Sequence, residues 1–239
     1  MNTDEELAQN FARLAVSLVL PDGAELRERI AAAAPVLVPG CEQAALSLLD
    51  RHGGIVTVAA TGPAAARAGE IQQEVGSGPG VDAIRVTTLC RVGDLLLAGE
   101  WPEFSRRAAR QAGVRSMMAV RLSAGDHVLG ALNLYASMPY ALGAAAAARA
   151  EPLAAHSALA LAAAACRRRC AELEEALQSS RSIGIALGIV MVRLRVSSSE
   201  AFDVLRRCAY RQRRKVREVA AEIVLTGEVP EAGRRTMDR

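Results

Sequence analysis

Apolar residues in the first part of the chain recur at helical spacing, in two runs separated by Pro21, Asp22 and Gly23. This pattern predicts helices over residues 4–20 and 24–36. Further along, apolar residues gather in short runs between turn residues, which is typical of strands. The expected strands are residues 45–49, 55–59, 89–92, 117–122 and 128–135.

Turn residues between these runs indicate how the strands connect. Two hairpins are expected, at residues 50–54 and 123–127, because each contains glycine between two apolar runs. The Gly- and Pro-containing stretch over residues 61–80 is expected to be a loop region. Short helices are expected over residues 82–86 and 101–112. This order of elements predicts an α+β fold, an antiparallel sheet with helices on one face.

A long helical pattern, rich in alanine, begins after Tyr140 and is nearly continuous from Pro152 to Arg193, with Pro152 expected in the first turn. A heptad frame fits this stretch. Its two core positions hold Leu159, Cys166, Leu173, Ser180 and Leu187, and Ala163, Cys170, Leu177, Gly184 and Met191. The seam is small and partly polar, so we expect a weak coiled coil that forms a dimer stalk assisted by the front domain. Cys166 and Cys170 lie in it as packing residues or, under oxidation, as an inter-chain disulfide.

Three helical patterns follow one another over residues 181–227 with almost no linker. Ser197 and Glu200 begin the second one with the spacing of a capping box, in which each side chain accepts a backbone N–H of the other residue. Gly227 ends the third, with Pro230 beyond it. The expected core positions are Ile183, Leu187, Val190, Met191 and Leu194, then Ala201, Phe202, Leu205 and Ala209, then Val216, Val219, Ala220, Ile223 and Val224.

Charge is divided unequally along the 239 residues, a length that has room for one large and one small domain. Residues 1–165 carry 13 basic and 16 acidic side chains, residues 166–217 carry 13 and 5, and residues 218–239 carry 3 and 5. The middle stretch therefore has a net charge of +8 in a chain whose formal net charge is +3. A mildly acidic front and a strongly basic stretch suggest a sensor joined to a polyanion binder.

An aromatic residue lies inside a basic run where the second and third of these last helices meet. The candidate nucleic-acid contacts there are Arg207, Tyr210, Arg211, Arg213, Arg214, Lys215 and Arg217. Guanidinium groups hold phosphates while a base stacks on a tyrosine ring, which suits single-stranded or looped RNA. The alternative is a solvated basic turn in which Tyr210 covers the small core.

Further motif positions are spread through all three helices. They are Arg181, Ala186, Gly188, Ile189 and Met191, then Glu200, Ala201, Phe202, Leu205 and Arg206, then Arg214, Lys215, Val216, Val219 and Ala220. On these residues the segment resembles an ANTAR domain, the RNA-binding module of transcription antiterminators. The resemblance implies a grip on paired RNA hairpins of a nascent transcript, which prevents a terminator hairpin from forming. It adds Arg181 and Ala186 to the candidate contacts.

Turn and sheet motifs also recur in the front part of the chain. They are Gly78-Pro79, Asp82-Ala83, Trp101-Pro102-Glu103-Phe104, Gly113-Val114-Arg115-Ser116 and the run from Val128 to Tyr135. On these motifs the front part resembles a GAF domain of the type that precedes ANTAR modules in actinobacteria. The resemblance implies a small-molecule pocket lined by parts of residues 70–104 and by the strands around Met117 and Leu132. A dimerisation domain without a pocket is the alternative.

We therefore expect three parts: a GAF-like sensor and dimerisation domain over residues 1–165, a coiled-coil connector over residues 166–180 and an ANTAR RNA-binding domain over residues 181–239. The expected partners are RNA hairpins, a second copy of the chain and a small-molecule ligand of unnamed class. A DNA-binding regulator and a protein-interaction module are the alternatives. Against DNA, the last helix turns acidic at Glu218 and Glu222, which is poor for a major groove.

The sequence contains no catalytic grouping that we can recognise. His52, His127 and His156 lie in separate elements without Cys or Glu at ligand spacing, so we expect no enzyme, no metal and no cofactor. Cys90 is expected to be a buried packing residue. The polar N-terminus does not fit a signal peptide, and the alanine-rich stretch over residues 141–165 is too weakly apolar to span a bilayer. We expect a cytoplasmic protein without a membrane partner.

Overall fold

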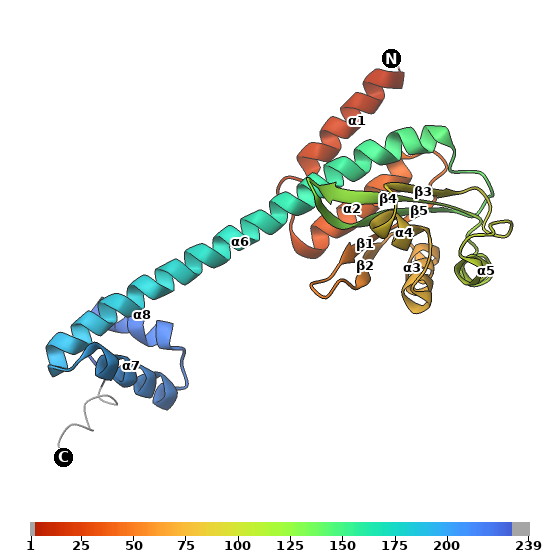
Figure 1. The fold of residues 1–239 in the computed structure, drawn as a ribbon. Coiled ribbons are helices and arrows are strands. Elements are labelled where there is room, and N and C mark those ends of the chain that lie inside the picture. The colour runs from red at the N-terminus through yellow and green to blue at the C-terminus, as the bar shows by residue number, and fades with distance from the viewer. Residues whose placement is uncertain (1–2, 231–239) are drawn as a thin grey trace. The chain divides into compact units, whose positions relative to one another are not determined.

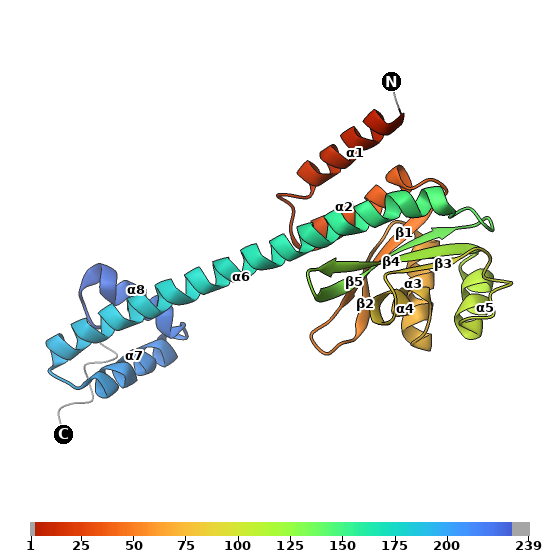
Figure 2. The ribbon, with the colours of Figure 1, turned by 45° about the horizontal axis from the view of Figure 1, so that its top comes forward.

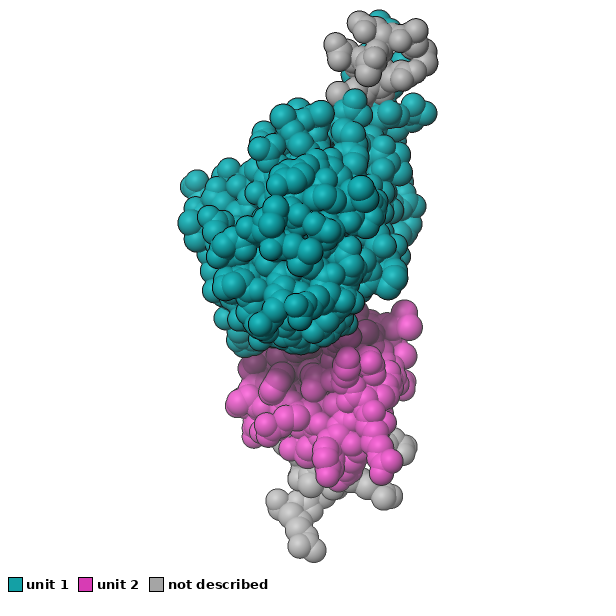
Figure 3. Space-filling view, turned by 90° about the vertical axis from the view of Figure 1, so that its right-hand side faces the viewer, with its two compact units in different colours: residues 1–165 teal, residues 166–239 magenta. Residues whose placement is uncertain are grey.

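The chain divides into two compact units, Met1–Ala165 (unit 1) and Cys166–Arg239 (unit 2), which Figure 3 distinguishes by colour. The computed structural model describes residues 3–230. Within this described part each unit has a hydrophobic core of its own. The long helix α6, Ala144–Leu194, contributes residues to the cores of both units (Figure 1).

Unit 1 is organised around an antiparallel sheet whose strands are β1 Gln43–Leu49, β2 Ile55–Ala60, β3 Leu89–Val92, β4 Ser116–Ala124 and β5 His127–Ala136. The strand order is β2-β1-β5-β4-β3 (Figure 1). The predicted strands and both predicted hairpins are confirmed. In the first hairpin, one carboxylate oxygen of Asp50 accepts hydrogen bonds from the N–H groups of His52 and Gly54, each at 2.8 Å.

Helices cover both faces of this sheet, whereas the sequence predicted one. The helices of unit 1 besides α6 are α1 Thr3–Ser17, α2 Gly23–Leu37, α3 Pro63–Val75, α4 Pro79–Arg85 and α5 Pro102–Gln111. One face packs against α1, α2 and the start of α6, and the other packs against α3, α4 and α5 (Figure 2). In β4, Met118 and Val120 join the first core, and Met117 and Ala119 join the second. A strand that is apolar at every position needs a covering layer on each side.

Helix α3 occupies a stretch that the sequence analysis assigned to a loop. That assignment is wrong because the helix buries small residues, Ala65, Ala68 and Gly69, which leave no clear apolar period. The small residues allow a close approach: a Cβ at Gly69 would lie 2.5 Å from the Thr57 hydroxyl oxygen. The helix ends at Gly76, whose positive φ of 69° suits glycine.

Two further predictions, of the start of α4 and of the place of Pro152 in α6, differ from the structure. Helix α4 begins at Pro79 instead of residue 82, with the proline in its first turn. Helix α6 begins at Ala144, so Pro152 lies inside the helix and not in its first turn.

Unit 2 consists of the C-terminal part of α6 with α7, Ser198–Gln212, and α8, Val216–Thr226, around a small core. The predicted capping box at Ser197 and Glu200 and the glycine end of α8 are confirmed. Two predicted core residues are not buried: Phe202 is 41% exposed and Val224 is 37% exposed. The buried face of α7 consists of Ala201, Val204, Leu205, Cys208 and Ala209.

Gly130 in β5 offers a test of the sheet geometry. A Cβ there would lie 2.0 Å from the Ser47 carbonyl oxygen and 2.8 Å from the Leu48 Cα, both backbone atoms that cannot move aside alone. We expect Gly130→Ala to lower the free energy of unfolding by about 1–3 kcal/mol, the usual cost of overpacking. The measurement is denaturant unfolding of the full chain. Gly143→Ala is the matched control, because nothing lies within 4 Å of its Cβ position. Equal midpoints for both variants would contradict the close approach.

Candidate functional site

The exposed face of α7 carries a row of two aromatic residues with an arginine between them. Phe202, Arg206 and Tyr210 are four residues apart, and residues at this spacing lie on one side of a helix. We call these three residues the α7 stripe. Arg206 also forms an ion pair with Asp203 at 3.0 Å. The sequence analysis missed Phe202 and Arg206 as surface candidates because it placed Phe202 in the core. Their four-residue spacing to Tyr210 was the available signal.

The exposure of Tyr210 tests one of the two interpretations of this residue, the one in which it covers the core. Tyr210 is 86% exposed and does not belong to the core cluster of unit 2. Val204, Leu205 and Cys208 close that core on the α7 side. The interpretation in which Tyr210 covers the core is therefore wrong. An exposed aromatic ring next to cationic side chains has a free face on which a nucleobase can stack.

The turn between α7 and α8 is built from basic residues. Arg213 ends α7 in the left-handed conformation, with φ 53°, and its N–H bonds to the carbonyls of Ala209 and Tyr210. Lys215 is the N-cap residue of α8 and has extended backbone angles. Both side chains are exposed, and within residues 3–230 neither takes part in an ion pair. The turn therefore presents two cations that no carboxylate of residues 3–230 pairs with.

Arg214, between these two residues, is held by the acidic side of α8. Its guanidinium forms an ion pair with Glu222, and its Nε lies 3.8 Å from a carboxylate oxygen of Glu218. Its Nη1 also donates to the Gln212 side-chain oxygen at 3.1 Å. The sequence analysis grouped Arg214 with the phosphate contacts. In the structure it fastens the turn to α8, and it would have to leave these partners to reach a phosphate.

Arg217 ties the start of α8 to α6. Its Nη1 lies 2.6 Å from a carboxylate oxygen of Glu175. Arg181 is exposed on α6 six residues beyond Glu175, which is about 9 Å along a helix axis. Arg207 and Arg211 are exposed on α7, one turn apart. These candidates lie on the three helices of one compact unit.

Ala186 was proposed as an RNA contact, but its side chain is fully buried in the core of unit 2. It lies on α6 one turn before Val190, which is equally buried. A methyl group at this place allows α7 and α8 to approach α6. Ala186 therefore serves the core, and direct contact with RNA is not available to it in this conformation.

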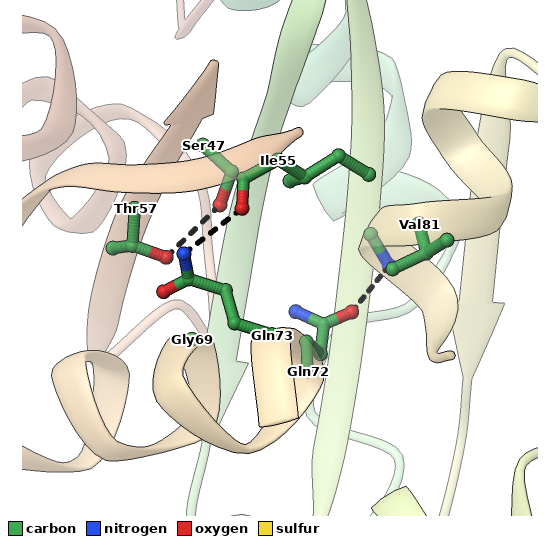
Figure 4. Close-up of a pocket in the computed structure, with 8 residues that line it drawn as sticks. Ser47, Ile55, Thr57, Gly69, Gln72, Gln73 and Val81 are labelled. Carbon is green, nitrogen blue, oxygen red and sulfur yellow. Dashed lines mark hydrogen bonds between the residues drawn. The ribbon is translucent and has the colours of Figure 1, made fainter. Parts of the chain in front are cut away.

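Unit 1 contains a small cavity between the sheet and α3 and α4, shown in Figure 4. It is lined by Ser47, Ile55, Thr57, Gly69, Gln72, Gln73, Gly80 and Val81. Its volume is about 20 Å³, which is room for one water molecule, whereas ligand pockets measure about 300–1,000 Å³. The cavity lies on the expected side of Met117, but Leu132 faces the opposite core. The strand around Leu132 reaches this face of the sheet through its neighbour Asn133, which bonds to the cavity-lining Ser47.

Polar side chains meet beneath this cavity in an otherwise apolar core. The Asn133 amide donates to the Ser47 hydroxyl at 3.1 Å, and the Ser47 and Thr57 hydroxyls are 3.3 Å apart. The Gln72 side-chain oxygen accepts the Gly80 N–H at 2.8 Å (Figure 4). The Asn133 side-chain oxygen is buried and has no hydrogen-bond partner among the described residues. A buried acceptor that stays without a partner costs about 1–3 kcal/mol.

The cysteines of unit 1 are protected thiols. Burial raises the pKa of Cys41 to about 12 and the pKa of Cys90 to about 11. Because the thiolate is the reactive form, both groups are unreactive near neutral pH. The expectation that Cys90 is a buried packing residue is confirmed.

Two further searches cover the described residues only. Over residues 3–230, no group of three or more His, Cys, Asp or Glu side chains is arranged to hold a metal ion. In the same range no single helix is long and apolar enough to cross a membrane; α6 and α7 pass that test only as a pair, which is bent by 105°.

Comparison with known families gives a match for each unit. The family model of the GAF domain matches residues 24–162, and that of the ANTAR domain matches residues 171–224. The predicted order of a GAF domain followed by an ANTAR domain is confirmed. The ANTAR match begins ten residues before the predicted boundary at residue 181, inside the stretch predicted as a connector. The extent of that connector remains a prediction.

Solved structures resemble the fold at low sequence identity. The GAF domain of a phosphoenolpyruvate-protein phosphotransferase from Coxiella burnetii has a TM-score of 0.54 and 13% identity, covering 70% of this chain and 99% of that one. The free methionine-R-sulfoxide reductase from Neisseria meningitidis, solved with its substrate, has a TM-score of 0.55 and 15% identity, covering 70% and 95%. Among curated proteins none matches the chain. The matched domains are regulatory types, although the reductase is an enzyme with this fold.

The capping box at the start of α7 can be tested by substitution. The Ser197 hydroxyl accepts the Glu200 N–H at 3.4 Å, and the Ser197 N–H donates to the Glu200 carboxylate at 2.8 Å. We expect Ser197→Ala to lower the free energy of unfolding by about 1 kcal/mol. Ser198→Ala, at the next position and outside the box, is the control. Denaturant unfolding of the full chain measures both.

The same box predicts a dependence on pH. Hydrogen bonds from Ser197 lower the pKa of Glu200. A carboxyl group with a lowered pKa stabilises the fold above its unfolded pKa, and this contribution is lost as the pH falls through the folded pKa. The difference between wild type and Ser197→Ala should therefore shrink in acid. If the difference in free energy of unfolding stays constant as the pH falls below the pKa of Glu200, the charge of Glu200 does not contribute to the cap.

Proposed function

We propose, since the chain belongs to the GAF domain family and carries an ANTAR domain behind it, that it is a transcription antitermination regulator that binds hairpin RNA under the control of a signal at the GAF domain. An ANTAR domain implies an RNA-binding antitermination regulator, and a GAF domain implies a ligand-sensing domain. The proposal includes three specific features. The chain binds RNA hairpins, a signal controls it, and it acts as a homodimer in the cytoplasm, where nascent transcripts are made.

The observation that supports RNA most strongly is the exposure of Tyr210 among cations. A single-stranded or looped RNA offers splayed bases for stacking and phosphates for charge pairing. Tyr210 supplies the ring, and Arg213 and Lys215 follow it within five residues as cations that form no ion pair within the described part of the chain. The ring and the charges therefore suit a hairpin loop and the phosphates that flank it.

The mechanism requires two RNA grips. Each chain holds one hairpin, and two linked chains hold a pair of hairpins with a gain in effective concentration. RNA held in this form cannot pair into the terminator hairpin, so the polymerase continues. Leu173 and Leu177, exposed on α6 at 54% and 74%, supply an apolar surface for the second chain.

The DNA-binding alternative meets an electrostatic obstacle. A recognition helix in the major groove needs a face free of carboxylates towards the phosphates. In α8, Glu218 and Glu222 lie around Arg214 and neutralise it, and Arg217 is paired with Glu175.

Titration of the full chain with hairpin RNA and with duplex DNA of equal length, in the same moderate salt, tests the proposal. Preference for the duplex DNA would overturn it.

On the sensor side, the polar cluster around Asn133 supports a site for the signal. The unpaired Asn133 oxygen and the Gln72–Gly80 hydrogen bond lie where α3 and α4 cover the sheet. A small polar ligand that donates to Asn133 gains a bond that the described chain lacks. Its entry requires α4 to move, because a Cβ at Gly80 would already lie 2.3 Å from the Asn133 oxygen.

In the turn between α7 and α8, Arg214 is paired with carboxylates, whereas Arg213 and Lys215 are not paired within the described residues. This difference predicts that their substitution changes the salt dependence of RNA affinity to different extents. RNA affinity should fall steeply between about 50 and 200 mM salt. We expect Arg213→Gln and Lys215→Gln each to lower the slope of log affinity against log salt by about one. Arg214→Gln should lower the slope less, because Glu222 and Glu218 already hold this guanidinium. Fluorescence titrations at several salt concentrations measure the slopes. If all three variants lower the slope equally, Arg214 contacts phosphate as much as Arg213 and Lys215 do, and the distinction between them is wrong.

Tyr210 should contribute by stacking and not by folding. We expect Tyr210→Ala to weaken binding of a hairpin with an accessible loop base by about 1–3 kcal/mol, with little effect on the salt slope. Tyr210→Phe should bind well, and Tyr210→Leu should bind poorly. Because Tyr210 is 86% exposed, all three variants should melt like the wild type.

The control for these variants is Leu225→Ala, a large residue that is 87% exposed on α8 and outside the basic corner. It should change neither melting nor binding. If Tyr210→Leu binds the hairpin as tightly as the wild type, the aromatic ring is not required, and stacking is wrong even though the basic corner still binds RNA.

A further inference from the structure

Two thiols lie close together on the uncovered part of α6. Cys166 and Cys170 are one helical turn apart, and both are exposed. The Cys166 sulfur is near enough to raise the pKa of Cys170. They differ from Cys41, Cys90 and Cys208, which are buried. The stretch from Cys166 to Cys170 contains the pair of cysteines that a small oxidant or a second chain can reach.

These thiols continue an apolar seam that the chain itself leaves open. Leu173 and Leu177 follow Cys166 and Cys170 at the same heptad positions and are 54% and 74% exposed. Cys166 and Leu173 are at d positions, and Cys170 and Leu177 are at a positions. In a two-stranded coiled coil, a and d residues face the partner helix. Over residues 166–178 every residue is exposed, so no described part of the chain covers this seam.

We propose that a second copy of this chain docks on the seam in parallel and in register, and that Cys166 and Cys170 then form disulfides with their own counterparts, which makes the stalk a thiol–disulfide lock. This inference rests on the homodimer of the proposed function. Facing a and d positions of a parallel pair bring identical residues together. The lock converts a weak dimer into a covalent one without any change at the RNA-binding face.

Charge favours the parallel arrangement. In the heptad frame Arg169 is a g residue, and Glu174 is the e residue of the next heptad. A parallel pair brings g of one chain beside the following e of the other, so Arg169 meets the other copy's Glu174 twice by symmetry. Within residues 3–230 of the single chain, Arg169 pairs with Glu172 at 3.5 Å, an exposed contact of the kind that stabilises weakly.

The oxidation step needs a small disulfide such as oxidised glutathione. One cysteine thiolate attacks it, forms a mixed disulfide and releases one glutathione thiolate. The facing cysteine of the other chain, as its thiolate, then attacks the protein sulfur and releases the second glutathione. Two protein thiols are oxidised to one disulfide, and one oxidised glutathione is reduced to two glutathione molecules. The two protons lost by the cysteines are taken up by the released thiolates.

The test uses the purified full chain treated with oxidised glutathione and separated on a gel without reductant. We expect covalent dimers from the wild type, from Cys166→Ser and from Cys170→Ser, and none from the double variant. Each single variant retains one pair of identical facing cysteines. Loss of the dimer in both single variants would mean that Cys166 meets Cys170 of an antiparallel copy, which overturns the parallel register.

Other outcomes also test the proposed inter-chain disulfides. A wild-type chain that remains a monomer but becomes two hydrogen atoms lighter has formed a disulfide within one helix, and this overturns the lock. Covalent dimers from the double variant would assign the link to a buried cysteine and overturn it as well. Light scattering of the reduced wild type and of Leu173→Asp with Leu177→Asp tests the dimer separately. A reduced dimer that does not crosslink keeps the proposed homodimer and removes only the lock.

The lock should also change RNA binding in a specific way. At protein concentrations where the reduced chain is monomeric, the oxidised wild type should bind an RNA with two hairpins at least about tenfold tighter, because the second grip becomes intramolecular. Binding of a single hairpin should change little. The double variant should show the same affinity with and without oxidant. An equal gain for one and two hairpins would contradict a role of the lock in pairing the grips.

Discussion

Both units depend on the continuity of α6, because one helix supplies residues to the cores at its two ends. Ala150 and Leu153 are fully buried in unit 1, and Ala186 and Val190 are fully buried in unit 2. Every residue over 166–178 is exposed, so the described parts of the chain bury little of the stretch between them. Helices without packing are marginal in water. The middle of α6 therefore relies on good helix formers, on its two anchored ends and on any partner that covers the seam.

In unit 2 the same kind of side chain serves folding and binding. The core is small, and ion pairs of Arg214 with Glu222 and of Arg217 with Glu175 fasten α8 to its neighbours. Exposed pairs of this kind stabilise weakly, but they hold the corner in one geometry. The net charge of +8 over residues 166–217 therefore overstates the number of phosphate contacts. The cations without a carboxylate partner are the ones that a polyanion meets first.

Sequence patterns predicted those elements whose signal is local. The strands, the capping box at Ser197 and the end of α8 depend on alternation, cap chemistry and glycine, which are visible in a few residues. Tertiary packing decided the rest. Helix α3 was missed because Ala65, Ala68 and Gly69 pack closely without being strongly apolar. Phe202 was misplaced because apolar character alone does not decide whether a residue at the edge of a helix face is buried. Ion pairing of Arg214 depends on Glu222 eight residues away and could not be read from the basic run.

In unit 1, the cluster of Ser47, Gln72 and Asn133 was not predicted from the sequence, because it places polar side chains where a core is expected to be apolar. Asn133 and Ser47 lie on the sheet face that α3 and α4 cover, and Gln72 reaches over from α3. A cavity of about 20 Å³ has room for one water molecule and not for a larger ligand. An apolar residue in place of Asn133 would remove the cost of its side-chain oxygen, which has no hydrogen-bond partner among the described residues. A closed cavity that retains this cost is more easily opened than a well-packed core. Under the proposed function, a signal would therefore act by displacing α4 from Asn133 and not by filling a preformed pocket.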